Sequence, residues 1–181
     1  PPFLLQVGSW FRHKNLELSI LAFARSQARD QGFHLAFVGG GAPSAYAASL
    51  RELAASEGVA DSIHWLENVT GEQLPQLFSA ASALLQPSFY EGFGLPVLEA
   101  MAAGTPGVVA EASCLPEVAG KAWPSAPPDD ADAFAAALDK MAMGGPERER
   151  AISLGLKRAQ EFSWRRTAEA TAAFLRWSGE A

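Results

Sequence analysis

Five short apolar runs recur along the chain, and each is followed by a stretch with helical spacing. The runs cover residues 3–7, 34–38, 63–66, 83–86 and 107–110. Continuous apolar runs of this length are typical of strands that are buried on both faces of a sheet. Because strands and helices alternate at short intervals, the pattern predicts βαβ units and a parallel sheet.

The stretches between these runs predict the helices that would cover the sheet. Residues 15–29 carry an apolar stripe at helical spacing, with Asn15 as the expected N-cap. Residues 45–57 and 72–81 have the same character, the latter after a Thr70 cap, and a further helix begins near Leu95. The predicted fold is α/β: a doubly wound, Rossmann-like parallel sheet with helices on both faces.

The last third of the chain follows a proline-rich break, W-P-S-A-P-P-D-D at residues 123–130. Residues 132–143, 146–161 and 164–177 then predict three successive C-terminal helices, the first two separated by a Gly-Gly-Pro step. We expect all three to pack on the edge and outside of the sheet.

Composition narrows the class of protein. With 181 residues, 49% of them hydrophobic, the chain suffices for one domain over residues 1–181. A net charge of -6 argues against a nucleic-acid binder, which usually has a basic face. The single cysteine, Cys114, excludes an intrachain disulfide and fits a reducing compartment, where we expect it to be a small buried thiol.

The chain shows no run of 18 apolar residues and no basic segment followed by an apolar stretch at its start. These absences predict a cytoplasmic protein without a membrane span or a signal peptide. The chain opens with P-P-F-L-L-Q-V-G, directly at a predicted strand and without an initiator methionine. We therefore expect it to be part of a longer protein.

Two loops that follow predicted strands carry candidate chemistry. Ligands of open parallel sheets bind beyond the carboxyl ends of the strands, where loops lead into helix N-termini. The first loop, residues 8–15, brings Arg12, His13 and Lys14 to the start of a helix, where free N–H groups already favour an anion. The sequence therefore predicts an anion site at this loop.

The second loop contains a glycine turn between two glutamates. Gly92-Phe93-Gly94 allows the backbone to approach a ligand closely, and the N–H groups of the helix that follows can point at a phosphate. Glu91 precedes this helix and Glu99 lies within it, so we expect the two carboxylates to flank the anion site without neutralising it. Because one carboxylate can accept from both hydroxyls of a diol, the ligand suggested is both sugar and phosphate.

Several other patterns have simpler structural interpretations. Asp130 and Asp132 have the D-x-D spacing of some metal sites, but they open a helix after two prolines, which favours capping. The glycines at 39–41 lack the third glycine of a dinucleotide motif, and we interpret them as a tight turn bordering the ligand. His34 and His64 lie on strands without a further ligand at metal spacing, so both are expected to be structural and no metal is expected.

The stretch E-G-F-G-L-P-V-L-E-A-M-A-A-G-T-P, residues 91–106, resembles the E-x7-E motif of retaining glycosyltransferases of family four. The flanking L-F-S-A-A-S-A-L-L-Q-P-S and S-C-L-P-E-V-A-G extend the resemblance, and V-G-S-W-F-R-H-K-N occupies the position of the family's phosphate loop. These group 1 enzymes have the GT-B fold of two facing Rossmann-like domains. The resemblance covers nearly the whole chain as the C-terminal, donor-binding half.

This resemblance implies a role for each site residue. Glu99 would hold the ribose diol of a nucleotide sugar, Glu91 would contact the transferred sugar, and Lys14 would balance the departing diphosphate. Further donor contacts would come from the loop glycine Gly8 and from the backbone around the glycine turn: Phe93, Gly94 and Leu95.

Two positions depart from the family pattern. The family often has an arginine directly after the loop glycine, where this chain has Ser9, so Arg12 is the expected substitute. The nucleotide base usually lies at the segment matching residues 66–69, which makes Val69 the expected base contact. Glu67 stands there in place of a frequent glycine.

The function implied by the resemblance is transfer of a hexose from a nucleoside-diphosphate sugar to a saccharide or lipid acceptor in polysaccharide biosynthesis. The Lys14-Asn15 pair resembles many mannosyltransferases and favours GDP-mannose as donor. Neither a cofactor nor a metal is expected, and acceptor binding and any peripheral membrane association would belong to a missing N-terminal half. A nucleotide-sugar epimerase, a non-catalytic nucleotide-sugar binding module and, less favoured, a dinucleotide oxidoreductase remain as alternatives.

Overall fold

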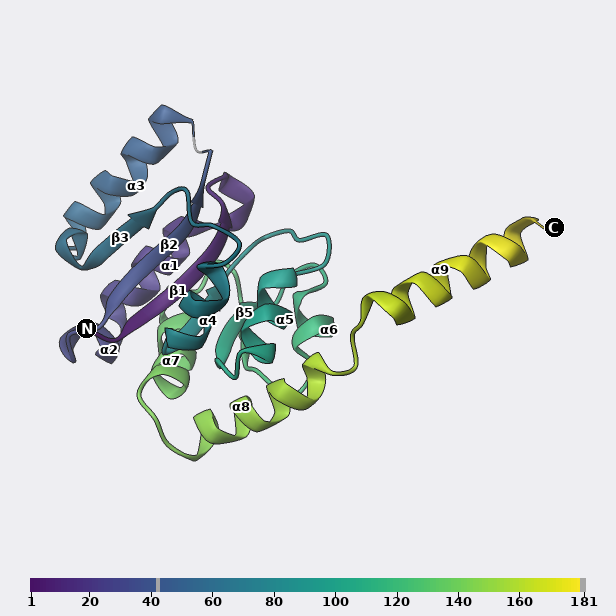
Figure 1. Cartoon of the computed structure of the whole chain (residues 1–181). Helices are drawn as coiled ribbons and strands as arrows, with labels where there is room; N and C mark the ends of the chain where they lie inside the picture. The colour runs from purple at the N-terminus through teal and green to yellow at the C-terminus, as the bar shows by residue number, and fades with distance from the viewer. Residues whose placement is uncertain (42, 180–181) are drawn as a thin grey trace.

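A six-stranded parallel sheet forms the centre of the molecule in the computed structural model, which describes residues 1–41 and 43–179 (Figure 1). The strands lie in the order β3-β2-β1-β4-β5-β6, and every neighbouring pair is parallel. Their bounds are Phe3–Ser9 (β1), His34–Gly40 (β2), Ile63–Leu66 (β3), Ala83–Gln86 (β4), Gly107–Ala110 (β5) and Ser125–Ala126 (β6). The predicted doubly wound sheet is confirmed. β6 was missed because two residues are too few for a hydrophobic pattern.

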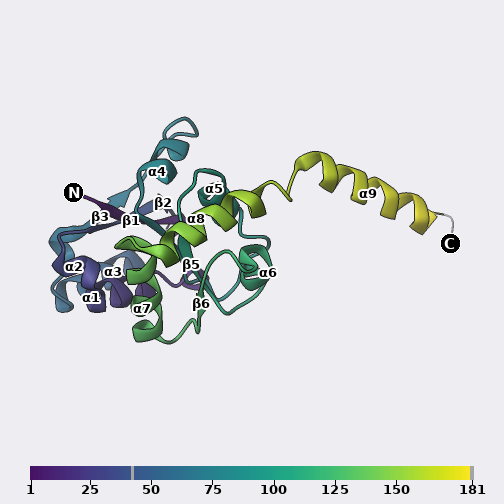
Figure 2. The ribbon, with the colours of Figure 1, turned by 90° about the horizontal axis from the view of Figure 1, so that it is seen from below.

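Helices cover both faces of this sheet. One layer contains α1, α3 and α7, and the opposite layer contains α4, α5 and α8 (Figure 2). The helix bounds are Leu16–Arg25 (α1), Gln27–Asp30 (α2), Ser44–Ser56 (α3), Leu74–Ala80 (α4), Leu95–Ala102 (α5), Leu115–Ala119 (α6), Ala131–Ala142 (α7), Pro146–Ala159 (α8) and Trp164–Gly179 (α9), with short 3-10 turns at Arg12–Lys14 (η1) and Ala60–Ser62 (η2).

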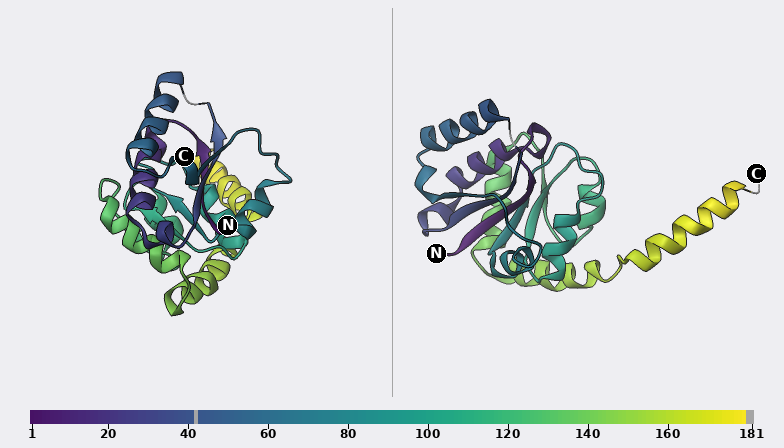
Figure 3. Two further views of the ribbon diagram at one scale, coloured as in Figure 1. Left: turned by 90° about the vertical axis from the view of Figure 1, so that its left-hand side faces the viewer. Right: turned by 45° about the horizontal axis from the view of Figure 1, so that its top comes forward.

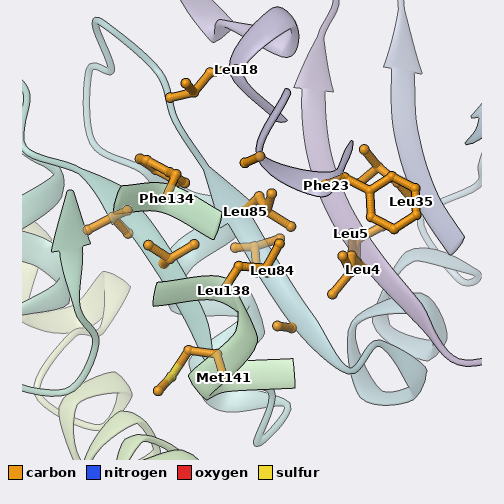
Figure 4. Close-up of a cluster of buried hydrophobic side chains, with 14 of the residues drawn as sticks. Leu4, Leu5, Leu18, Phe23, Leu35, Leu84, Leu85, Phe134, Leu138 and Met141 are labelled. Atoms are coloured by element: carbon orange, nitrogen blue, oxygen red, sulfur yellow. The ribbon is translucent and has the colours of Figure 1, made fainter. Parts of the chain in front are cut away.

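The core lies where the central strands meet these layers. Leu5 of β1, Leu84 and Leu85 of β4, and Phe134 and Leu138 of α7 are completely buried in one cluster (Figure 4). Each such side chain contributes roughly 1.5 to 3 kcal/mol through its removal from water. The continuous apolar runs are therefore explained by burial on both faces of the sheet.

The predicted helix over residues 15–29 is broken at Ser26, whose backbone is extended with ψ 148°. The second piece, α2, begins against α7, where the Asp139 carboxylate accepts from the N–H groups of Gln27 at 3.0 Å and Ala28 at 3.2 Å. A carboxylate from a distant helix thus satisfies the donors exposed by the break. Local spacing cannot reveal such a partner.

The two predicted helix caps have different outcomes. Asn15 occupies the N-cap position of α1, as predicted, but its side chain makes no capping hydrogen bond. Thr70 does cap: its hydroxyl accepts from the N–H of Gln73 at 3.3 Å, and the Gln73 side chain accepts from the N–H of Thr70 at 3.0 Å. This reciprocal capping box precedes α4, which begins at Leu74.

The last helix does not pack as predicted. α7 and α8 cover the sheet, whereas α9 projects away from the body of the molecule (Figures 1 and 3). Its Trp164, Phe174 and Trp177 are 79%, 61% and 67% exposed. α8 packs against α5 and α7, and the chain runs past this layer before α9 begins at Trp164. No helix in the described part of the chain is both long and apolar enough to cross a membrane.

The glycines at 39–41 were predicted to form a tight turn, but only the last of them lies beyond a strand. Gly39 and Gly40 still belong to β2 and pair with Gly8 and Ser9 of β1; the chain turns only at Gly41. Gly39 has φ 149°, and a Cβ there would lie 1.9 Å from the carbonyl oxygen of Gly8. A residue without a side chain is therefore required where the two strands end together.

We predict that Gly39→Ala lowers the free energy of unfolding by about 2 kcal/mol or more, because the methyl group meets backbone in a conformation that L residues rarely adopt. Urea unfolding measures the loss. Gly71→Ala is the matched control, since a Cβ at Gly71 meets nothing within 4 Å. If both variants unfold like the wild-type chain, close packing at Gly39 does not limit stability.

Candidate functional site

The candidate site lies where the connections of the sheet change direction. β1 and β4 are neighbours at the centre, β2 and β3 extend to one side, and β5 and β6 extend to the other. The loop after β1 leads to α1 on one face, and the loop after β4 leads to α5 on the opposite face (Figure 2). In open α/β sheets, loops that diverge in this way form the ligand-binding crevice.

A bidentate ion pair joins these two loops. The Lys14 ammonium lies 2.7 Å from Oε1 and 2.6 Å from Oε2 of Glu91. The Lys14 side chain is 16% exposed and that of Glu91 7%. We expected both carboxylates to flank the anion site without neutralising it. For Glu91 this expectation is wrong, because its carboxylate is paired with Lys14.

Neighbouring side chains hold the Glu91 carboxylate in place. Gln86 Nε2 donates to Oε1 at 2.6 Å, and the Ser88 hydroxyl donates to the same oxygen at 2.8 Å. Gln86 and Ser88 are themselves completely buried. A carboxylate with this many donors is fixed in both position and direction.

The backbone of Glu91 is held from the opposite side by the loop before α6. The Ser113 hydroxyl donates to the Glu91 carbonyl at 2.8 Å and accepts from its N–H at 3.2 Å. The Cys114 thiol lies 3.4 Å from the same carbonyl. Cys114 is half-buried at this loop, so its prediction as a buried core thiol is wrong.

The loop after β1 is shaped to present Lys14. A Cβ on Gly8 would lie 3.6 to 3.8 Å from the end of the Lys14 side chain, at a φ of 146° that favours glycine. Gln6 Nε2 donates to the Lys14 carbonyl at 2.9 Å. The N–H of Phe89 donates to the His13 carbonyl at 2.9 Å, which joins the two loops directly.

Arg12 belongs to the same turn but has other contacts. Its guanidinium lies 4.0 Å from the Glu17 carboxylate and 5.0 Å from the centre of the Tyr46 ring. Burial and the hydrogen bond to Glu17 raise the pKa of the Tyr46 hydroxyl. The Arg12 side chain is 81% exposed and, in this structure, contacts α1 and α3 instead of the Lys14–Glu91 pair.

The glycine turn lies at the N-terminus of α5. Gly94 has φ 87° at the N-cap, and Pro96 occupies the first turn of the helix, where its missing N–H leaves no hydrogen bond unmade. Phe93 and Leu95 are each 45% exposed and line an apolar hollow of about 390 Å³ with Phe162 and Trp164. Gly92 and Phe93 of this turn are exposed, whereas Gly94 is buried.

Glu99 lies one turn into α5, in a different hollow. This cavity of about 480 Å³ is formed between α4 and α5, with Leu74, Phe78 and Ala102 in its wall. Partial burial of the carboxyl group raises the pKa of Glu99 above its usual value. The two glutamates of the motif thus have unlike surroundings: Glu91 is paired and enclosed, and Glu99 is exposed at the rim of a cavity.

The segment expected at the base follows β3 and lies near the end of β2. Val69 is half-buried against the core, and Asn68 before it has φ 62°. The Glu67 carboxylate lies within 4.0 Å of where a Cβ on Gly40 would stand. This segment therefore lies next to the carboxyl end of β2.

The acidic D-x-D pair lies elsewhere. Asp130 accepts from the N–H of Ala133 at 2.9 Å and caps α7, as predicted, while Asp132 lies 3.2 Å from Arg25. His34 and His64 face each other at the start of their strands, with ring nitrogens 2.7 Å apart. Among the described residues, no three His, Cys, Asp or Glu side chains gather in a way that could hold a metal ion.

Sequence reasoning missed the residues that support Glu91. Gln86 stood at the end of a predicted strand and Ser88 and Ser113 stood in flanking stretches, so none was assigned a role. A polar glutamine within the apolar run A-L-L-Q was the available signal, because a buried glutamine requires a hydrogen-bond partner.

Comparison with known proteins gives one family. The model of the family described as glycosyl transferases group 1 matches residues 1–158. The O-antigen chain mannosyltransferase B of Escherichia coli is 46% identical over 102 residues, which are 56% of this chain and 27% of that protein. The MMP alpha-(1->4)-mannosyltransferase of Mycolicibacterium hassiacum is 39% identical over 126 residues, 67% of this chain and 31% of that protein.

Solved structures show the same fold over almost the whole chain. Sucrose-phosphate synthase from Thermosynechococcus elongatus superimposes with a TM-score of 0.85 at 28% identity, over 99% of this chain and 46% of that one. HepE of Anabaena, in complex with UDP and glucose, gives 0.85 at 19% identity, over 96% and 48%. The chain thus spans less than half the length of each of these proteins. It belongs to the group 1 glycosyl transferases.

Proposed function

We propose that this chain is the donor-binding half of a retaining glycosyltransferase that transfers a hexose from a nucleoside-diphosphate sugar, with GDP-mannose the favoured donor. The observation that carries the proposal is the enclosed Lys14–Glu91 pair, located between the two crevice loops and beside the N-terminus of α5. Two relatives named as mannosyltransferases support a mannose donor, and the UDP and glucose bound by HepE support a nucleotide sugar as ligand.

The proposed mechanism begins with an exchange of partners. A diphosphate entering the crevice draws the Lys14 ammonium away from Glu91, since the two phosphates together carry more negative charge than one carboxylate. Glu91, still held by Gln86 and Ser88, then accepts hydroxyls of the hexose. Negative charge that develops on the departing diphosphate is stabilised by Lys14 and by the positive end of the α5 dipole.

The remaining donor contacts of this proposal are those that the family resemblance implies. Glu99 accepts from the ribose hydroxyls at the rim of its cavity, and the backbone of residues 93–95 approaches the sugar and the distal phosphate. Val69 contacts the base. Arg12 reaches the diphosphate only by leaving Glu17 and Tyr46, which its high exposure permits. No metal takes part in this proposal, because the positive charges are side chains and helix N–H groups.

We propose that the acceptor is a saccharide or lipid and that it binds to a second, N-terminal half of a cytoplasmic enzyme. The chain spans less than half of the proteins it matches, which leaves room for such a half. The projecting α9 supports a further partner surface, because its Phe174 and Trp177 are exposed and their rings lie next to each other.

We predict that Glu99→Gln weakens binding of nucleoside diphosphates by roughly 10- to 100-fold, because an ionised acceptor for two hydroxyls is lost. In the wild-type chain, affinity falls as the pH drops through the pKa of Glu99. Since that pKa is raised, the fall occurs at higher pH than for an ordinary glutamate. Calorimetric titrations with GDP, UDP and ADP between pH 4 and 8 measure both effects, with exposed Glu52→Gln as control.

A second prediction separates the roles of the two glutamates. Glu91→Gln tightens binding of the free diphosphate about fivefold to tenfold, because Lys14 no longer has to leave a carboxylate, and weakens binding of the complete nucleotide sugar. Lys14→Ala weakens diphosphates far more than nucleosides. Titrations in the presence of EDTA test these effects without a metal. Equal losses for both ligands in both glutamate variants would refute the assignment.

A third prediction concerns transfer. The 181-residue chain binds donor but transfers no sugar, because positioning both reactants supplies on the order of 7 to 11 kcal/mol of barrier reduction and one wall of a cleft forgoes most of it. The assay incubates the chain with labelled nucleotide sugars and candidate acceptors, with and without an added N-terminal half. Multiple-turnover transfer by the chain alone would show that it holds a complete active site.

A further inference from the structure

Asn15 is a buried residue of the crevice to which the proposed mechanism gives no task. It is 5% exposed and separates η1, which carries Lys14, from the first residue of α1. Its backbone is left-handed, with φ 54° and ψ 50°, a conformation that asparagine tolerates better than most residues. Asparagine thus suits the turn, but glycine would suit it as well, so the side chain requires its own explanation.

The side chain of Asn15 connects three loops. Its Nδ2 donates to the carbonyl of Pro87 at 3.0 Å and to the carbonyl of Pro128 at 2.7 Å. Both partners are carbonyl oxygens, so the amide orientation is determined and both of its hydrogens are used. Pro87 begins the loop that carries Glu91, and Pro128 precedes the cap of α7. One amide therefore joins the Lys14 loop, the Glu91 loop and the start of α7.

We infer that Asn15 is a positioning residue that holds the Lys14 ammonium against Glu91 and directs it toward the diphosphate. Two hydrogen bonds from residues next to Lys14 join its loop to the Glu91 loop: the Asn15 amide donates to the Pro87 carbonyl, and the His13 carbonyl accepts from the N–H of Phe89. Without the amide, the Lys14 loop would lose its side-chain hydrogen bonds to the carbonyls of Pro87 and Pro128, while the bonds of Lys14 to Gln6 and Phe11 and the Phe89–His13 bond would remain. This inference rests on the proposed function for its ligand, although the positioning itself concerns groups within the chain.

The test variant is Asn15→Gly, which keeps the left-handed turn and removes only the amide. Asn15→Asp is the second variant, because it keeps the shape and replaces the donor with an acceptor that faces two carbonyl oxygens. Thermal unfolding confirms that each variant folds before it is used. Either variant that folds suffices for the measurements.

The first readout needs no nucleotide. Reductive methylation with formaldehyde and a borane, followed by peptide mass spectrometry, measures the reactivity of Lys14 relative to the exposed Lys121 and Lys157 of the same molecule. We expect Lys14 to be protected in the wild-type chain and its relative rate to rise about tenfold in Asn15→Gly, since the hydrogen bonds of the amide to the Glu91 loop and to the start of α7 are both lost. An unchanged relative rate in a folded variant would overturn the inference.

The second readout is a double-mutant cycle on diphosphate affinity. GDP, UDP and ADP are the probes, with the corresponding nucleosides as references. Asn15→Gly should weaken the bound diphosphate about tenfold and leave the nucleoside unchanged, and this loss should vanish in the Lys14→Ala background. A loss that persists without Lys14 would show that Asn15 acts by another route. If no diphosphate binds the wild-type chain, the proposed function fails, while methylation still decides the role of Asn15.

Discussion

The enclosed ion pair between Lys14 and Glu91 is the interaction on which the candidate site depends. Removing two charges from water costs several kcal/mol for each ion, and a close pair offsets this cost only when further hydrogen bonds complete the shell. Gln86 and Ser88 supply those bonds to the carboxylate. Gly39 and Gly8 allow β1 and β2 to end together beneath the pair.

The pair also explains why the two glutamates of one motif differ. The carboxylate of Glu91 accepts hydrogen bonds from neighbouring side chains, and its backbone is hydrogen-bonded to the Ser113 hydroxyl. Such a fixed position suits the proposed role of orienting a sugar. Glu99 lies eight residues later at the cavity between α4 and α5, where the proposed function would put the ribose. A single short stretch thus supplies one pre-positioned acceptor and one accessible acceptor.

Sequence reasoning succeeded where the physical signal is local. The five longer strands follow from apolar runs, and the Thr70 and Asp130 caps follow from their places before predicted helices. It failed where the cause is tertiary. The second piece after the break at Ser26 is held by Asp139, 113 residues away, and the amphipathic spacing of α9 does not reveal that the helix projects away from the sheet (Figure 1).

The candidate site shows the same division. Lys14 and Glu91 were both predicted as site residues, but their pairing joins positions 77 residues apart and no spacing rule predicts it. The position of Asn15 before a helix predicted that it is the N-cap residue, but this position says nothing about the partners of its side chain. Only the placement of the loops of Pro87 and Pro128 reveals where its amide donates.

The most direct test of the central claim is a crystal structure of the chain with the nucleoside diphosphate that it binds most tightly. We predict that the Lys14 ammonium contacts a phosphate oxygen and has left Glu91, while Gln86 and Ser88 still hold the carboxylate. A structure in which the nucleotide occupies the crevice and Lys14 remains on Glu91 would contradict the proposed exchange of partners.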